Sequence, residues 1–130
     1  MFIVTHTHIH QHDSAELADI VSRSVEANVG AIITAGVTLE DSRKAIAVAR
    51  EHERVFAGVG VHPTDLTGPL NEEDIAGLKE LAALSEVVVM SEIGIDHQDR
   101  SPDWRWQEDA FRVQIEIART HGLSIVFHVR

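Results

Sequence analysis

The chain has 130 residues, the size of one domain, and its apolar (44%) and charged (25%) content is ordinary for a globular protein. It has 11 Lys and Arg residues against 21 Asp and Glu residues, a formal net charge of −10. That balance excludes non-specific binding of duplex DNA through a basic surface, but not an enzyme that acts on nucleic acid. Cysteine is absent, which excludes disulfides and thiolate metal sites, so a metal ion must use histidine and carboxylate ligands.

Nothing in the sequence indicates a membrane or a secretion signal. No apolar run approaches the roughly 18 residues that a membrane span requires. The first strand-like run begins at Phe2, without a basic segment followed by a long apolar stretch. We therefore expect no signal peptide and no membrane contact, and the lack of cysteine fits a location in the cytoplasm.

Short apolar runs alternate with longer amphipathic segments along the whole chain. Strands are predicted at residues 2–4, 31–36, 55–61, 87–94 and 123–128. Helices are predicted to begin at Asp13 or Ser14, at Thr38, at Asn71 and near Trp104. Gly30 and Gly122 are expected to end the first and the last of these helices, and Trp104, Phe111, Ile115 and Ala118 to face the core.

This alternation predicts an α/β fold. Near-continuous apolar strands separated by amphipathic helices are typical of a parallel sheet that is buried on both faces. No low-complexity segment or linker divides the chain, so residues 1–130 are expected to form one domain. The alternation alone leaves open whether this sheet stays open or closes into a barrel.

Polar side chains fall at the carboxyl ends of the predicted strands. His6 and His8 follow the first strand, His62 the third, Glu92 the fourth and His128 the fifth. These ends share one edge of a parallel sheet or barrel, where active sites lie. Glu92 ends an apolar run, so its carboxylate needs a buried partner, either a metal ion or an arginine. The set therefore predicts a site for one or two divalent metal ions.

The first strand leads into THTHIHQHD, in which four histidines occupy alternate positions. His6 and His8 are expected to be metal ligands because a carboxylate and another imidazole end strands on the same edge. His10 and His12 lie beyond the expected end of the strand, so we expect them to be solvated loop residues.

Several motifs resemble those of the TatD family of metal-dependent hydrolases, within the amidohydrolase-type barrels. They are THTHIH at residues 5–10, GVGVHP at 58–63, SEIGID at 91–96 and IVFHVR at 125–130. The helix before the last strand also resembles the family pattern Q-x-x-x-F-x-x-Q, with Gln107, Phe111 and Gln114. The resemblance covers the whole chain in the right order, and it implies that the five parallel strands and four helices are the first part of a TIM-type (β/α) barrel.

The resemblance implies a metal centre and gives each ligand a role. His6 and His8 correspond to the first metal ligands and His128 to the ligand at the fifth strand. Glu92 corresponds to the catalytic carboxylate that can bridge two metals. Imidazole and carboxylate ligands suit Zn²⁺ or Mn²⁺, whereas Mg²⁺ prefers more oxygen ligands.

The resemblance also implies a substrate. Members of the family are described as deoxyribonucleases, some with 3′-to-5′ exonuclease activity, so the expected substrate is nucleic acid, single-stranded DNA in particular. His62 matches a position associated with the substrate phosphate, and Arg130 matches the arginine of the strand-five motif. The expected reaction is hydrolysis of a phosphodiester by a metal-activated water.

The chain departs from the family pattern in two ways. Val4 and His10 stand where the family usually has Asp, which affects hydrogen bonding around the first two histidines. A (β/α)₈ barrel also needs about 250 residues, and the family's later ligands, a histidine after strand six and an aspartate after strand eight, have no counterpart. The sequence leaves open whether the chain is a fragment or a short product with an incomplete site.

Two other functions remain open at this stage. An amidohydrolase acting on C–N or ester bonds commonly has a bridging lysine, but Lys44 and Lys79 are predicted within helices, which favours a phosphodiesterase. A metal-binding fragment without turnover is the third possibility. The open edges of a five-strand sheet would also expose apolar residues, so self-association through these edges is expected.

Overall fold

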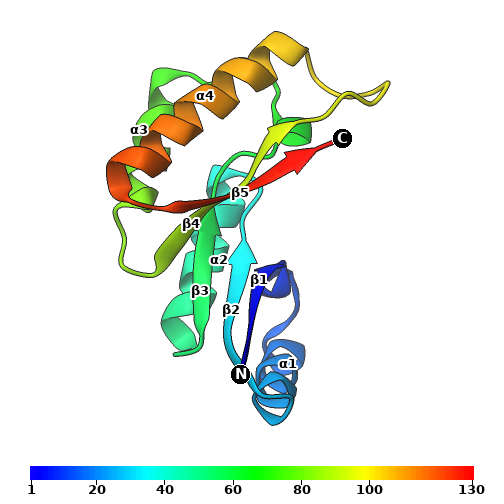
Figure 1. Ribbon diagram of the computed structural model, residues 1–130, viewed down its shortest axis with the longest axis vertical. Helices are drawn as coiled ribbons and strands as arrows, with labels where there is room; N and C mark the ends of the chain where they lie inside the picture. Colours follow the sequence, from blue (N-terminus) through cyan, green and yellow to red (C-terminus); the bar gives the residue numbers. More distant parts are fainter.

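The computed structural model describes residues 1–130 and contains one sheet of five parallel strands (Figure 1). The strands are β1 (Phe2–Thr7), β2 (Val29–Ala35), β3 (Val55–Val59), β4 (Val87–Ile95) and β5 (Ser124–Val129). The helices are α1 (Ser14–Glu26), α2 (Leu39–Glu51), α3 (Glu72–Ala82) and α4 (Trp104–His121). Two 3₁₀ helices, η1 (Ile9–Gln11) and η2 (Pro63–Asp65), follow β1 and β3. The strands lie side by side in chain order, as in the first part of a TIM-type barrel, so the predicted architecture is confirmed.

The helices begin at the predicted capping residues. The Asp13 carboxylate accepts hydrogen bonds from the first turn of α1, Thr38 caps α2, and Asn71 forms a complete capping box with Asp74. Helix α1 ends at Glu26, however, so the predicted end at Gly30 is wrong. The predicted end of α4 at Gly122 is confirmed, because Gly122 adopts a left-handed conformation (φ 67°) directly after that helix.

The turn from α1 into β2 is made at Asn28, which has a positive φ of 61°. Asparagine tolerates this left-handed conformation better than most residues. Because the turn is made there, Gly30 lies within β2 instead of ending the helix.

The core lies between the helices and the three inner strands. Its apolar members include Leu78 of α3, Met90 and Ile93 of β4 and Ile117 of α4, all of them buried. Trp104 is 52% exposed, so its predicted burial is wrong. It is the first residue of α4 and precedes the inward positions of that helix, which are Gln107, Ala110, Gln114, Ile117 and Ala118.

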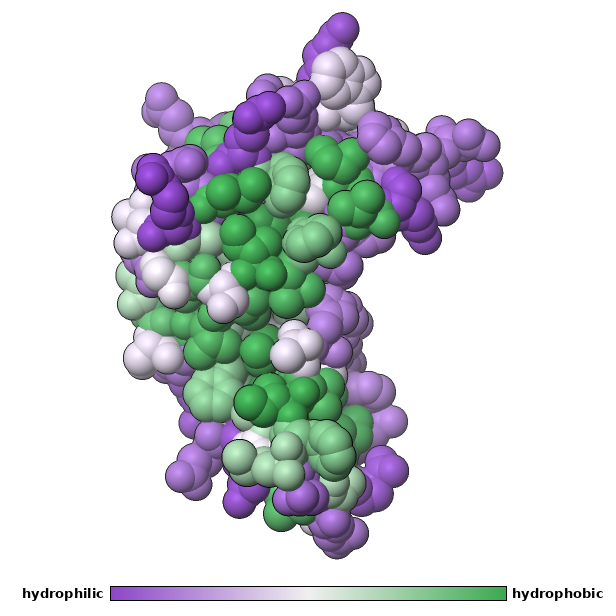
Figure 2. All heavy atoms as spheres, in the orientation of Figure 1, coloured by the Kyte–Doolittle hydropathy of each residue, from purple (hydrophilic) through white to green (hydrophobic).

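The two outer strands are open at their free edges. Phe2 and Ile3 of β1 are 66% and 62% exposed, and Phe127 and Val129 of β5 are 63% and 73% exposed. Figure 2 shows a continuous apolar area along the face turned to the viewer. No helix combines the length and the apolar character that crossing a bilayer requires.

The carboxyl ends of the five strands form one edge of the sheet, which we call the rim. At the rim, β4 approaches β5 so closely that residue 94 has no room for a side chain. Gly94 has a φ of 149°, and a Cβ built on it would lie 2.0 Å from the carbonyl oxygen of His128. This close approach brings the ends of β4 and β5 together.

Candidate metal centre

Five of the six predicted site residues come together at the rim, around the carboxylate of Glu92. Its Oε2 lies 3.4 Å from Nε2 of His6 and 3.8 Å from Nε2 of His62. Its Oε1 lies 3.3 Å from Nδ1 of His128. Two groups of metal-binding side chains share this carboxylate: the β1 group of His6, His8 and Glu92, and the β5 group of His62, Glu92 and His128.

One of the two histidines of the β1 group is oriented by the neighbouring strand. Nδ1 of His8 lies 2.8 Å from the carbonyl oxygen of Ala35 at the end of β2. A carbonyl can only accept a hydrogen bond, so Nδ1 carries the proton and Nε2 keeps its lone pair. In His6, Nδ1 is buried and has no hydrogen-bond partner. One ring of this group is thus held in a ligand-competent tautomer, and the other leaves a buried nitrogen unsatisfied.

The strand-five histidine is oriented by a carboxylate that the sequence analysis did not single out. Nε2 of His128 donates to Oδ2 of Asp96 over 2.8 Å, which leaves Nδ1 facing Glu92. Metal-binding histidines are commonly held in this way by a carboxylate on the far ring nitrogen. The available signal was the place of Asp96 in SEIGID, as an acidic residue directly after a buried strand.

Asp96 is fully buried, and both of its oxygens are occupied. Oδ1 accepts hydrogen bonds from the Ser101 hydroxyl and from the backbone N–H of Gln98, and Oδ2 accepts from His128 and Arg130. The Ser101 hydroxyl, followed by the Gln98 N–H, holds the pKa of Asp96 far below its usual value. Asp96 is therefore an anion at neutral pH, and its Oδ2 accepts the Nε2 proton of His128.

His62 is oriented differently from the other rim histidines. Its Nδ1 accepts a hydrogen bond from the backbone N–H of Thr64 over 3.2 Å and lies 2.7 Å from the Thr64 hydroxyl. Burial lowers the pKa of His62, which favours the neutral ring. In a neutral ring with Nδ1 as acceptor, the proton is on Nε2, the atom that faces Glu92. His62 therefore presents an N–H donor at the rim, not a lone pair.

Arg130 is anchored at one nitrogen only. Its Nε donates to Oδ2 of Asp96 over 3.0 Å, and its side chain is 55% exposed. The two terminal nitrogens of the guanidinium make no hydrogen bond within the chain, so they are free to bind a planar or tetrahedral oxyanion at the edge of the site.

The donor set fits a divalent cation. Glu92 is only 20% exposed, and the groups within ion-pair distance of its oxygens are three imidazoles. The arginine alternative fails because Arg130 is bound to Asp96. A partly buried carboxylate that has only imidazoles around it lacks a compensating charge. The unsatisfied Nδ1 of His6 is a second sign that the β1 group is incomplete without a further partner.

His10 is buried (8% exposed), so the prediction of a solvated loop residue is wrong. Helix η1 turns the ring inward, where Nδ1 lies 2.6 Å from Oγ1 of Thr34 and Nε2 lies 2.9 Å from Oδ2 of Asp41. Burial raises the pKa of Asp41, but the hydrogen bonds from His10 and from the Val37 N–H keep it below its usual value. His10 thus joins β1 to β2 and α2.

His12 behaves as predicted. Its side chain is 42% exposed and forms an ion pair of 2.8 Å with Glu16 on the first turn of α1. Of the four alternating histidines, the first two reach the rim, the third is a buried structural residue and the fourth lies at the surface.

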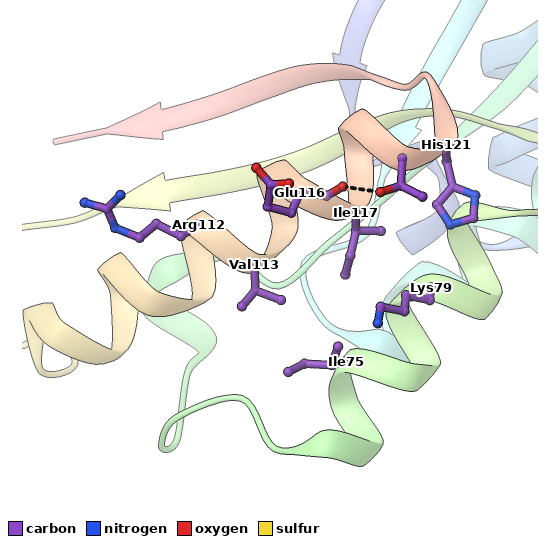
Figure 3. A pocket seen from close by; sticks show the side chains of 8 residues that line it. Ile75, Lys79, Arg112, Val113, Glu116, Ile117 and His121 are labelled. Atoms are coloured by element: carbon purple, nitrogen blue, oxygen red, sulfur yellow. Dashed lines mark hydrogen bonds between the residues drawn. The ribbon is translucent and has the colours of Figure 1, made fainter.

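A hollow of about 460 Å³ lies away from the rim, on the outer face between α3 and α4 (Figure 3). Ile75, Val113 and Ile117 form its apolar part, and Lys79 and Arg112 lie at its borders. It contains no group of metal-binding side chains, so the rim remains the candidate centre.

Comparisons with known proteins identify the family of the chain. The family model described as "TatD related DNase" matches residues 4–130. A protein of Bacillus subtilis named "Uncharacterized metal-dependent hydrolase YabD" is 34% identical over 100% of this chain and 51% of its own length. A "3'-5' ssDNA/RNA exonuclease TatD" of Cronobacter sakazakii is 34% identical over 92% of this chain and 44% of its own length.

A solved structure supports the same assignment. The TatD homologue YjjV of Escherichia coli superposes with a TM-score of 0.87 at 26% identity, over 99% of this chain and 51% of that one. The chain thus spans about half the length of the relatives that it matches. Because the family model matches nearly the whole chain, the protein belongs to the TatD family.

Proposed function

We propose that the protein is the metal-binding part of a hydrolase that cleaves phosphodiester bonds of nucleic acid, with single-stranded DNA as substrate. The observation that carries this proposal is the Glu92 carboxylate, which lies between His6 and His128 and has no cationic side chain beside it. The names of the relatives, metal-dependent hydrolase and ssDNA/RNA exonuclease, support the reaction and the substrate.

In this proposal the centre takes one or two divalent ions, with Zn²⁺, Mn²⁺ and Mg²⁺ as candidates. His6, His8 and Glu92 hold the first ion, while Glu92 and His128 contribute to the second. A bound divalent ion supplies an activated water and stabilises negative charge on the phosphate oxygens. Glu92 is the catalytic carboxylate, since it is common to both groups. The bonds to Ala35 and Asp96 keep His8 and His128 in the tautomers that coordination needs.

His62 and Arg130 bind the substrate phosphate in this proposal. The Nε2–H of His62 is an oriented donor directed at the rim, and its neutral ring does not compete with a metal ion for Glu92. The free nitrogens of Arg130 offer a second set of donors to the same phosphate.

The positions of the lysines weigh against an amidohydrolase. A bridging lysine is missing from the rim, because Lys44 pairs with Glu40 on the exposed face of α2 and Lys79 borders the hollow between α3 and α4. Metal binding without turnover is favoured by one observation. Asp96, the other carboxylate of the network, has both oxygens occupied and is not free to act as a base. Turnover by residues 1–130 distinguishes this alternative from the proposed hydrolase.

The test is metal binding and digestion of a labelled single-stranded oligodeoxynucleotide by the parent chain and by Glu92→Gln. We expect the parent to bind Mn²⁺ or Zn²⁺ and Glu92→Gln to lose activity by about 10³-fold. Glu108→Gln, on the exposed face of α4, is the matched control and should keep both properties. No bound metal at equimolar Zn²⁺ or Mn²⁺ would contradict the metal centre. Digestion that survives Glu92→Gln would contradict the catalytic role.

We also propose that the 130-residue chain associates with itself through its open edges. Phe2 and Ile3 on β1 and Phe127 and Val129 on β5 expose apolar surface beside unpaired backbone groups. Light scattering should therefore show a mass above 14.4 kDa that increases with concentration. A single monomeric species at all concentrations would overturn this proposal.

A further inference from the structure

The inner face of α4 contains two glutamines that are buried almost completely. Gln107 and Gln114 are each 1% exposed, and their side-chain hydrogen bonds go to backbone groups, not to the rim carboxylate Glu92. They lie seven positions apart on one face of the helix, which corresponds to about two turns. Burying two uncharged amides in an apolar core is costly unless all their hydrogen bonds are made.

Gln114 hydrogen-bonds both backbone groups of Val61, the residue before His62. Its Oε1 accepts from the Val61 N–H over 2.7 Å, and its Nε2 donates to the Val61 carbonyl over 3.2 Å. Because Val61 lies beyond the end of β3, no strand pairing fixes it. The side chain of Gln114 therefore holds the residue before His62, and the His62 N–H donates separately to the Val37 carbonyl over 2.9 Å.

Gln107 makes the same two bonds to the backbone of Asp96. Its Oε1 accepts from the Asp96 N–H over 2.7 Å, and its Nε2 donates to the Asp96 carbonyl over 3.0 Å and to the Pro102 carbonyl over 2.7 Å. Asp96 in turn holds Nε2 of His128. A chain of bonds thus runs from Gln107 through Asp96 to the histidine beside Glu92.

We propose that Gln107 and Gln114 are positioning residues for the rim, Gln107 setting His128 through Asp96 and Gln114 setting His62 through Val61. The pair acts on the β5 group alone, since both glutamines bond to backbone next to or behind His62 and His128, whereas His8 of the β1 group is oriented by the Ala35 carbonyl of β2. The inference deepens the proposed function, because it assigns one glutamine to a metal-binding side chain and the other to a substrate-binding side chain.

The first measurement needs neither metal nor substrate. Nitrogen-15 spectra of the histidine rings, recorded with a chelator, report the tautomer of each ring. Gln107→Met, which keeps the length of the side chain and removes its hydrogen bonds, should change the ring signals of His128 and leave those of His62. Gln114→Met should change the ring signals of His62 and leave those of His128 unchanged. Ile117→Ala, in the core on the same helix, is the matched control for lost stability and should change neither tautomer.

The second measurement uses Mn²⁺ and a thymidine trinucleotide as probes. Gln107→Met should weaken binding of Mn²⁺ at the β5 group by about 10- to 100-fold, the usual effect of losing a partner behind a ligand. Gln114→Met should leave Mn²⁺ binding unchanged and weaken binding of the trinucleotide by about tenfold, equivalent to the loss of one hydrogen bond of roughly 1.4 kcal/mol.

The outcomes separate the inference from the proposed function. If the parent chain binds no Mn²⁺, the proposed function fails, while the ring signals still test the positioning. If each methionine variant changes the ring signals of both histidines equally, or of neither, the positioning roles of Gln107 and Gln114 are overturned, whether or not the chain binds Mn²⁺. A variant that does not fold is replaced by Gln→Glu, which keeps the acceptor for the backbone N–H, and the same pairing of glutamine with histidine is expected.

Discussion

The β1 group and the β5 group share Glu92 but are held in different ways. In the β1 group, one bond to the Ala35 carbonyl orients His8, and Nδ1 of His6 is buried without a partner. In the β5 group, Thr64 fixes the ring of His62 and Asp96 fixes that of His128. The same residue type is thus firmly oriented on one side of the shared carboxylate and only partly on the other.

The cause of this difference is not the position of the strands. Both β1 and β5 are edge strands with exposed apolar side chains. The rim beside β5, however, is also contacted by the segment after β4, which brings Asp96, and by α4, which fixes that segment. The lesson is that the orientation of a rim histidine depends on what packs behind its ring.

The largest expected effect comes from Gly94→Ala, which breaks the β5 group. A Cβ at this position would lie 2.0 Å from the carbonyl oxygen of His128, so β4 and β5 must separate. We expect the free energy of unfolding, measured by urea denaturation, to fall by about 4 kcal/mol or more. Gly68→Ala is the control, because its Cβ meets nothing within 4 Å. Equal stability of the two variants would contradict the close approach.

Removing one ligand from each group should separate the two ion positions. We expect His6→Ala to weaken one Mn²⁺ position by about 100-fold or more and His128→Ala to weaken the other, each leaving the opposite position occupied. Calorimetric titration with Mn²⁺ gives the number of ions and their affinities. If either variant removes both ions, the two groups form one indivisible site and the comparison fails.

Acid should reveal the stronger anchoring of the β5 side. The pKa values of Asp96 and Asp41 both lie below their usual values in the folded chain, Asp96 by much more. The unfolded chain therefore binds more protons, and the stabilisation that is full above about pH 4 is lost as the pH falls. In metal-free protein, the free energy of unfolding should depend less on pH in Asp96→Asn than in Asp41→Asn. Urea denaturation between about pH 5 and pH 2 measures this pH dependence. Equal slopes of the free energy of unfolding against pH in the two variants would contradict the stronger anchoring of Asp96.

The smallest effect is expected for His12→Ala. Its ion pair with Glu16 is exposed on both sides, and such pairs contribute little to stability. We expect the free energy of unfolding to change by less than about 0.5 kcal/mol and the affinity for Mn²⁺ to stay the same. A loss of metal would show that the β1 group extends beyond His6 and His8.

Much of the fold could be predicted because its signals are local. The alternation of apolar runs and amphipathic segments gave five strands and four helices, and Thr38 and Asn71 marked the starts of two helices. Two local predictions failed, one for the end of a helix and one for a buried side chain. Asn28 made the turn that had been expected at Gly30, and Trp104 preceded the face of α4 that packs inward.

The sequence by itself determined which residues reach the rim. The carboxyl ends of parallel strands lie on one edge, so the order of strands and the residues at their ends were enough to bring His6, His62, Glu92 and His128 together.

Only the tertiary structure decided what each ring can do there. The tautomer of a histidine depends on the partner of its other nitrogen. Those partners are the Ala35 carbonyl, the Thr64 N–H and the buried carboxylate of Asp96. The same reason explains His10, whose place in an alternating pattern gave no sign that Thr34 and Asp41 would enclose it. A pattern in the sequence shows where a side chain is attached, whereas its protons are placed by neighbours that folding brings to it.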